Sequence, residues 1–272
     1  MNKKVVFLDI DGTLVTRMNA FPESAKEALR RARANGHEMV ICTGRARCQI
    51  PPWDKEGLID GMITAAGSCV YVGEKVAYAK LFSDAQKHFF ADYCLKYHIP
   101  YFFQAEDALY SAKWCEEDDF QIFLSTGLNE SEVRKVLSTV DFVEHPEEAD
   151  NIEKALYYNC KRTPEQVKAD FGEEFYITDS SFKASRFCDG EVTLAGIDKS
   201  AGIAAYLEAV GVPLEDSIAF GDGPNDLEML SYVHTGVAMG NGIQALKDIA
   251  TFVTDDVDKD GIYNGFQRLG LI

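Results

Sequence analysis

The chain has 272 residues, of which 46% are hydrophobic and 26% charged, and its formal net charge is −17. This composition is typical of a globular protein, and the length suffices for two domains. The negative charge argues against binding to nucleic acids or anionic membranes, because both require basic surfaces. We find neither an apolar run of about 18 residues that could span a membrane nor a signal-peptide pattern, so we expect a cytoplasmic protein.

The first predicted element is a strand that begins at Val5 and is apolar enough to be buried on both faces. It leads into Asp9 and Asp11, which an extended strand would place on one side, where both could share a hard cation. Aspartate and glycine after a strand are also ordinary turn formers, so this segment alone does not decide its own role.

The segments that follow alternate between helix and strand signals, which predicts a doubly wound, mainly parallel α/β sheet. We expect a helix bracketed by Pro22 and Gly36, strands at 38–42 and 61–65, and a hairpin at 70–78.

The middle of the chain is richer in aromatic residues and has acidic loops such as 116–119. We interpret 83–189 as an inserted α+β domain, between core segments 1–82 and 190–272. The expected elements are helices at 83–98, from 130 and at 164–171, and strands at 101–103, 108–111, 155–159 and on either side of 178–180.

From Gly190 the α/β pattern resumes. A helix opens at Asp198, and a strand at 217–220 runs into a Gly-Asp turn and a helix around 227–230. A strand at 236–239, a helix at 243–249, a short strand at 252–253 and a helix at 263–269 complete the core.

The seven cysteines are odd in number and have no CxxC spacing, which argues against a zinc site or a disulfide framework. Free thiols are typical of a reducing compartment. Cys42 and Cys69 lie in strand-like runs, where we expect small core residues.

Four polar clusters fall at predicted strand ends or at the start of a helix. They are Asp9-x-Asp11-Gly12-Thr13, Thr43-Gly44-Arg45, Lys199 and Gly221-Asp222-x-x-Asn225-Asp226. Taken singly, each is an ordinary turn, helix cap or solvated lysine. Strand ends of a parallel sheet converge on one edge, however, so the four together predict a single site.

Phosphoryl transfer needs the groups that these clusters offer. A carboxylate can attack phosphorus, and a second acid can protonate the leaving oxygen and then activate water. Mg²⁺ prefers carboxylate and phosphate oxygens, while lysine, hydroxyl and backbone N–H groups stabilise charge on the phosphoryl oxygens.

In these four motifs, and in the place of the insert between the second and third, the chain resembles the haloacid dehalogenase-like (HAD) phosphohydrolase superfamily. It is most similar to the Cof-type subgroup, which has an α/β cap in that position. The resemblance covers the whole chain and implies a Rossmann-like core, a cap domain and a Mg²⁺-dependent phosphatase of small phosphorylated metabolites such as sugar phosphates.

The resemblance implies that Asp9 is the nucleophile and a Mg²⁺ ligand, and that Asp11 is the general acid and base and also gives its backbone carbonyl to the metal. It implies that Asp222 ligates Mg²⁺, and that Asp226 either supports the metal or orients Lys199.

For the phosphoryl group, the resemblance implies contacts from Thr43, Lys199, Asn225 and the N–H of Gly44. Arg45 is expected either to bind the leaving group or to form a salt bridge, and the sequence does not choose between these two roles.

The chain departs from the subgroup at 66–68, which reads Ala-Gly-Ser where Asn-Gly-Ala is frequent. Two alternative functions remain open at this point: a phosphomutase on the same scaffold, and a non-catalytic binding module regulated by phosphorylation. The sequence indicates neither the individual substrate nor the oligomeric state.

Overall fold

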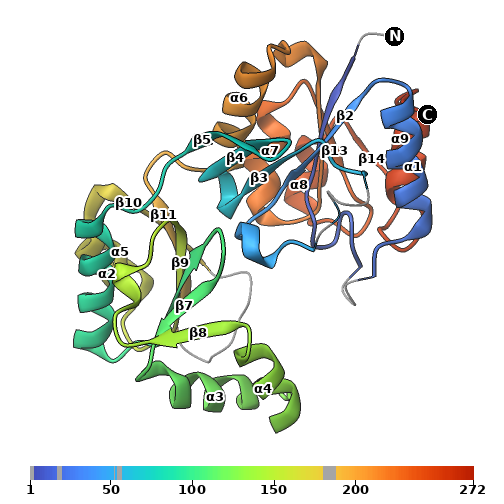
Figure 1. The fold of residues 1–272 in the computed structure, drawn as a ribbon. Coiled ribbons are helices and arrows are strands. Elements are labelled where there is room, and N and C mark those ends of the chain that lie inside the picture. Colours follow the sequence, from blue (N-terminus) through green and yellow to red (C-terminus); the bar gives the residue numbers. More distant parts are fainter. Residues whose placement is uncertain (1–2, 17–19, 52, 54–56, 180–187) are drawn as a thin grey trace. The chain divides into compact units, whose positions relative to one another are not determined.

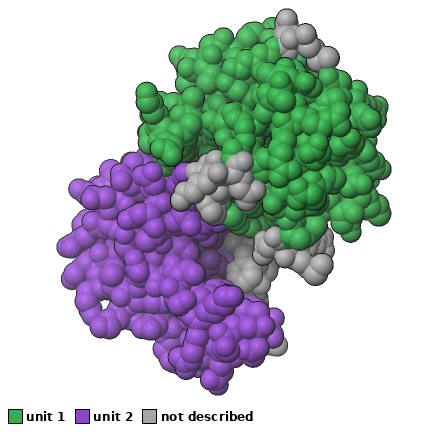
Figure 2. Space-filling model, turned by 45° about the vertical axis from the view of Figure 1, so that its right-hand side comes forward, with its two compact units in different colours: residues 1–45, 50–79, 198–272 green, residues 46–49, 80–197 purple. Residues whose placement is uncertain are grey.

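The computed structural model describes residues 3–16, 20–51, 53, 57–179 and 188–272. The chain divides into two compact units, shown in separate colours in Figure 2. The core unit comprises 1–45, 50–79 and 198–272, and the insert unit comprises 46–49 and 80–197. The unit limits therefore lie at 79/80 and 197/198, whereas the sequence placed the domain boundaries at 82/83 and 189/190.

The core unit is built on one sheet, whose described strands run in the order β14-β13-β12-β1-β2-β3-β4-β5 (Figure 1). Strands from β14 to β3 pair in parallel, and β4 and β5 extend the sheet as an antiparallel hairpin. The strands are β1 (Val5–Leu8), β2 (Glu38–Cys42), β3 (Gly61–Thr64), β4 (Cys69–Val72), β5 (Lys75–Ala79), β12 (Ser217–Gly221), β13 (Thr235–Ala238) and β14 (Phe252–Val253).

Helices cover both faces of this sheet, as expected for a doubly wound fold. Helices α6, α7 and α8 pack on one face through a shared apolar cluster, and α1 and α9 lie together on the other (Figure 1). Their bounds are α1 (Glu23–Ala34), α6 (Lys199–Val210), α7 (Leu227–Tyr232), α8 (Gln244–Ile249) and α9 (Gly261–Arg268). The predicted fold class of the core is thus confirmed.

Helix α6 matters most for the site because Lys199 is its first residue. The Asp198 side chain caps the helix by accepting a hydrogen bond from the Ala201 N–H at 2.9 Å. The helix ends at Val210 and is capped by Gly211, whose φ of +65° suits a residue without a side chain.

The sheet register brings three chain segments to one edge. Leu8 pairs with Phe220 on β12 and with Ile41 on β2, and all three strands are parallel. The residues that follow these strands therefore leave the sheet side by side, and they include Asp9 and Asp222.

The insert unit contains a second sheet, with described strands in the order β10-β11-β9-β6-β7-β8. Its pairs are antiparallel except for β7 with β8. Its strands are β6 (Tyr101–Ala105), β7 (Leu109–Ala112), β8 (Val140–Val143), β9 (Ile152–Cys160), β10 (Phe175–Asp179) and β11 (Cys188–Leu194), and its helices are α2 (Asp84–Tyr97), α3 (Cys115–Ser125), α4 (Glu130–Leu137) and α5 (Pro164–Phe171).

Two apolar clusters hold this second unit together, one on each face of its sheet. Helices α2 and α5 pack on one face, where Phe90 and Phe171 meet at a ring distance of 5.9 Å. Helices α3 and α4 pack on the other face, against Phe102 and Leu156.

Four details of the insert differ from the sequence prediction. Residues 116–119 form the first turns of α3 instead of a loop, and β8 is a strand that the sequence pattern does not predict. Strand β11 pairs with β9 and β10, so 190–194 belongs to the insert sheet and not to the core. Of the segment 178–180, the first two residues end β10, and Ser180 lies outside the described residues.

No helix in the described part of the chain combines the length and the apolar character needed to cross a membrane.

Candidate active site

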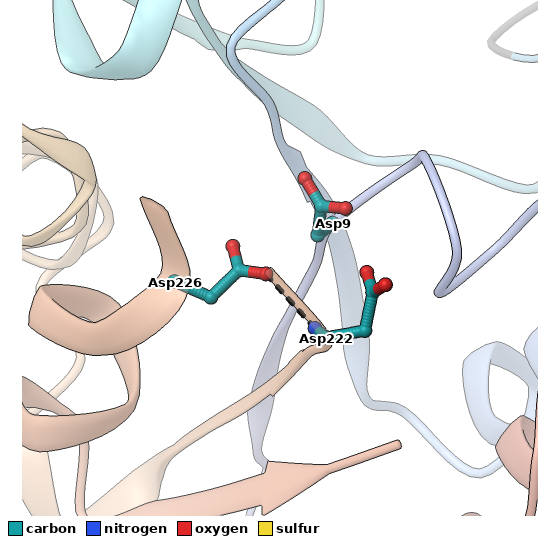
Figure 3. Close-up of side chains that lie close together, drawn as sticks. All are labelled: Asp9, Asp222 and Asp226. Atoms are coloured by element: carbon teal, nitrogen blue, oxygen red, sulfur yellow. Dashed lines mark hydrogen bonds between the residues drawn. The ribbon is translucent and has the colours of Figure 1, made fainter. Parts of the chain in front are cut away.

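Three carboxylates gather where β1 and β12 end. Asp9 follows β1, and its amide donates a hydrogen bond to the Phe220 carbonyl at 3.1 Å. Asp222 follows β12, and Asp226 ends the short 3₁₀ turn that comes next, η7 (Pro224–Asp226). One carboxylate oxygen from each of the three lies within 4.8 Å of the others, and Figure 3 shows the three side chains converging.

Lys199 joins two of these carboxylates. Its Nζ lies 2.6 Å from Oδ1 of Asp9 and 2.6 Å from Oδ1 of Asp226, and its side chain is only 1% exposed. Burial disfavours the charged ammonium, but Asp226 and Asp9 outweigh that effect and raise the pKa of Lys199. The lysine is therefore a permanent cation at the centre of the cluster.

The three carboxylates of the cluster carry more negative charge than Lys199 alone can neutralise. Burial raises the pKa of Asp9 to about 7, with further increases from Asp226 and Asp222, although Lys199 opposes the shift. Burial also raises the pKa of Asp222 to about 6, and Asp226 adds to it. These carboxylates would gain from a second cation, and closely spaced carboxylate oxygens are the ligands that hard divalent ions prefer. The residues thus fit a divalent metal ion.

Asp226 fixes the loop that carries Asp222. Its Oδ2 accepts hydrogen bonds from the backbone N–H groups of Asp222 and Gly223, both at 2.9 Å, and its side chain is fully buried (Figure 3). With Oδ1 on Lys199, the carboxylate has little freedom left. Asp226 therefore positions two other members of the cluster.

Two further side chains hold Asp222, and the sequence motifs assign no role to either. Thr13 donates through Oγ1 to Oδ1 of Asp222 at 3.2 Å. Asn241 donates from Nδ2 to the Gly12 carbonyl at 2.8 Å and to Oδ2 of Asp222 at 3.4 Å, while its Oδ1 accepts from the Val257 N–H at 2.8 Å. Asn241 stands 229 residues after Gly12, so its contact is not readable from local spacing.

Gly12 is required by its surroundings. Its φ is +90°, and a Cβ at this position would lie 2.3 Å from Oδ2 of Asp222. A larger residue would be strained and would also push the carboxylate out of place.

Asp11 lies outside the carboxylate group, contrary to the expectation that it shares a cation with Asp9 through its side chain. Arg45 holds its carboxylate with two hydrogen bonds, at 2.8 Å from Nε and 2.5 Å from Nη2. Because β1 ends at Leu8, the same-side rule for strands, on which that expectation rested, does not extend to Asp11. For Arg45, the structure contains the salt bridge, one of its two expected roles.

Thr43 and Gly44 lie at the carboxyl end of β2. Thr43 is 1% exposed, and its Oγ1 accepts a hydrogen bond from the Arg45 N–H at 3.2 Å. Its carbonyl accepts from Ala66 at 2.9 Å, which joins the loops after β2 and β3. Gly44 is half-buried there.

The loop after β3 lies against the start of α6. A Cβ on Gly67, whose φ is +112°, would meet the Asp198 carbonyl at 2.1 Å, so only glycine allows this approach. Ser68 directs its hydroxyl to the Ala65 carbonyl at 3.1 Å. The atypical 66–68 segment therefore serves local structure in this state.

Asn225 is exposed, and its side chain has no hydrogen-bond partner among the described residues. Of the residues predicted for the site, Asp9, Lys199, Asp222 and Asp226 form one bonded group. Asp11 and Arg45 form a separate pair.

Comparison with known proteins gives a consistent result. A profile described as haloacid dehalogenase-like hydrolase matches residues 6–266. "Putative phosphatase YkrA" of Bacillus subtilis (strain 168) is 30% identical over the full length of both chains.

Solved structures that resemble this chain point to the same family. A hypothetical protein from Geobacillus kaustophilus HTA426 matches all of both chains, with 30% identity and a TM-score of 0.86. The sugar phosphatase BT4131, described as a member of HAD subclass IIB, is 28% identical with a TM-score of 0.77. That match covers 99% of this chain and all of the other.

Proposed function

This chain belongs to the haloacid dehalogenase-like hydrolase family and is a phosphoric monoester hydrolase, and on that premise we propose that it hydrolyses sugar phosphates or similar small metabolites through an aspartyl-phosphate at Asp9, with Mg²⁺ as cofactor. The single observation that carries the proposal is the bonded group of Asp9, Lys199 and Asp226 next to Asp222. A buried carboxylate held by a buried lysine is fixed in position for attack on phosphorus.

We assign the chemistry as follows. Oδ2 of Asp9, the oxygen that Lys199 does not hold, attacks phosphorus, and the bond to the ester oxygen breaks. Asp11 gives its proton to the leaving alkoxide. Water then attacks the phosphorus of the aspartyl-phosphate, Asp11 accepts the proton from that water, and the Asp9 carboxylate is released with inorganic phosphate.

The other residues assist these steps. Lys199, Thr43, Asn225 and the Gly44 N–H bind the phosphoryl oxygens in this proposal. Arg45 must release Asp11, because a carboxylate that accepts two guanidinium N–H groups has no proton to give.

Asp9, Asp222, Asp226 and the Asp11 carbonyl would hold Mg²⁺. Bound there, Mg²⁺ would neutralise negative charge on the phosphoryl group. The proposal is supported by the spacing of the three carboxylate oxygens and by the raised pKa values of Asp9 and Asp222.

The substrate class rests on the insert unit acting as a cap that selects the leaving group, and on the likeness to a sugar phosphatase. A phosphomutase would instead return the phosphoryl group to a second sugar hydroxyl. A requirement for a bisphosphate activator would identify that reaction, and turnover without one would exclude it. A non-catalytic module no longer applies, since the chain is a phosphatase.

The decisive experiment traps the intermediate. Wild-type protein mixed with Mg²⁺ and a sugar phosphate is quenched in acid and digested, and we expect one added phosphoryl group on the peptide that carries Asp9. Asp9→Asn should neither acquire this group nor turn over, because an amide does not form the acyl phosphate. The matched control is Asp216→Asn, which removes a carboxylate paired with Lys4 at the opposite end of the strands. Phosphorylation elsewhere, or normal turnover by Asp9→Asn, would refute the mechanism.

Metal binding is tested without turnover. Calorimetric titration of Mg²⁺ into wild-type protein and Asp216→Asn should give the same affinity, and Asp222→Asn should bind at least about tenfold more weakly. Equal binding by Asp222→Asn would remove Asp222 from the metal site.

Asp11→Asn separates the acid role from the others. An alkyl leaving group needs a proton, whereas a nitrophenolate hardly does. We expect single-turnover phosphorylation to slow by about 100-fold on a sugar phosphate and much less on nitrophenyl phosphate. Equal losses on the two esters would exclude Asp11 as the acid.

A further inference from the structure

Two cysteines of the insert unit lie directly opposite each other. Cys160 ends β9 and Cys188 begins β11, and the two are register partners in this antiparallel pair. Both side chains pack on the face of the sheet that α2 and α5 cover. The two thiols therefore point to the same side of adjacent strands.

This arrangement fits a disulfide. Residues directly opposite in antiparallel strands have Cα atoms about 4.5 to 5.5 Å apart. Disulfides span Cα distances of about 4.4 to 6.8 Å. The pairing shifts register between Cys188 and Gly190, and this irregularity gives the end of the ladder freedom to adjust.

The surroundings of the two sulfurs favour a stepwise reaction. Cys188 is half-buried and so can meet a small oxidant, and its Sγ lies 3.5 Å from the Tyr157 hydroxyl. Cys160 is 1% exposed, and burial raises the pKa of its thiol. A solute therefore reaches the sulfur of Cys188 first, and the buried Cys160 reacts second.

None of the other five cysteines faces another cysteine in the registers of the described strands. Cys42, Cys69, Cys94 and Cys115 are buried, and Cys48 is exposed. In the registers of the described strands, Cys69 faces Ala79 and Cys42 faces Ile63. Burial raises the pKa of the Cys94 thiol, and Cys115 and Cys160 add to the shift, so Cys94 lies near Cys160 and is a competing partner to test.

We propose that Cys160 and Cys188 form a redox-responsive pair, reduced at rest and closed into a disulfide by low-molecular-weight disulfides such as oxidised glutathione. The Cys188 thiolate attacks one sulfur of glutathione disulfide, which releases one glutathione thiolate and leaves a mixed disulfide on Cys188. The Cys160 thiolate then attacks Sγ of Cys188 and expels the second glutathione. Two protein thiols are oxidised, one glutathione disulfide is reduced to two glutathione thiols, and the two protons pass to these.

Closure links the two ends of the segment that contains α5 and β10. A cross-link of this kind restricts the unfolded chain and stabilises the folded unit. The insert unit would therefore be more stable against unfolding under oxidising conditions, and it would lose this added stability when glutathione is mostly reduced.

The test uses the full-length protein. Wild-type chain is equilibrated with millimolar oxidised glutathione, alkylated under denaturing conditions and mapped by tryptic digestion. We expect the peptides carrying Cys160 and Cys188 to be joined and both sulfurs to escape alkylation, with full reversal by dithiothreitol. The melting temperature of the oxidised protein should rise by at least about 5 °C.

Two variants sharpen the result. Cys48→Ser removes the exposed thiol and should leave the joined peptides and the melting shift unchanged. Cys188→Ser should abolish both. The proposal fails if both sulfurs of wild-type protein remain open to alkylation, if Cys188 stops at the mixed disulfide, or if Cys160 joins Cys94 instead.

Discussion

Asp119 on α3 predicts an unusual dependence of stability on pH. Its side chain is fully buried, and neither carboxylate oxygen has a hydrogen-bond partner among the described residues. Burial raises the pKa of Asp119 to about 8, and neighbouring Asp118 contributes to the shift. The folded protein therefore keeps this carboxyl group protonated at neutral pH.

The sign and size of the effect follow from proton linkage. In the unfolded chain Asp119 loses its proton above its ordinary pKa of 3.8, whereas in the folded chain it keeps the proton until about pH 8. Stability therefore falls as the pH rises from about 4 to about 8 and changes no further above that, with a cost on the order of 4 kcal/mol at pH 7. Asparagine has nearly the same shape and does not titrate. Asp119→Asn should therefore remove this pH-dependent cost.

Urea unfolding at pH 5 and pH 7.5 measures the pH-dependent cost of burying Asp119. Trp114 immediately precedes α3, and in a Trp53→Phe background its fluorescence reports on this region. The stability advantage of Asp119→Asn over its parent should grow by about 3 kcal/mol between the two pH values. Glu117→Gln, an exposed change on the same helix, serves as the control and should show no such growth. An advantage that does not depend on pH would show that Asp119 is already ionised in the folded state.

Two further predictions concern the site. Gly12→Ala should weaken Mg²⁺ binding at least about tenfold in calorimetry, because its Cβ would displace Asp222. Gly36→Ala is the control, because Gly36 has the same φ of +90° but open space around it. This variant should cost only about 1 kcal/mol of stability and leave Mg²⁺ binding intact. Lys199→Met should lower the free energy of unfolding by about 3 to 5 kcal/mol, because it leaves two buried carboxylates without their cation. Lys4→Met, which breaks the partly exposed ion pair with Asp216, should lower it by less than about 1 kcal/mol. Equal metal affinity in the two glycine variants, or equal stability losses in the two lysine variants, would contradict these assignments.

The convergence of distant residues was predictable because it follows from a general property of parallel sheets. The carboxyl ends of the strands meet at one edge, and Lys199 opens a helix that packs on the sheet, so the sequence pattern predicts that Asp9, Lys199, Asp222 and Asp226 lie together. Asp11 could not be placed in this way. Its position depends on the residue at which β1 ends and on Arg45, and neither is determined by local sequence.

The insert was harder to predict than the core. The composition of the acidic run at 116–119 favours a loop, yet Glu116, Glu117 and Asp118 stabilise the start of α3, where backbone N–H groups are unpaired. Residues 190–194 carry strand signals that suit either sheet. Their membership is decided by pairing with β9 and β10, which is a long-range choice.

The split path of the core unit has a consequence for synthesis on the ribosome. The insert unit is almost continuous in sequence, whereas β1 needs β12 as a neighbour, and Lys199 follows Asp9 by 190 residues. Contacts of such high sequence separation form late. Nascent chains that have not yet emerged through β12 carry Asp9, the nucleophile in our proposal, without Asp222 and Asp226 and without three of the eight described strands of the central sheet. In our proposal, catalytic competence therefore arises only after Asp226 has been synthesised, so a chain terminated before that residue is inert toward phosphate esters.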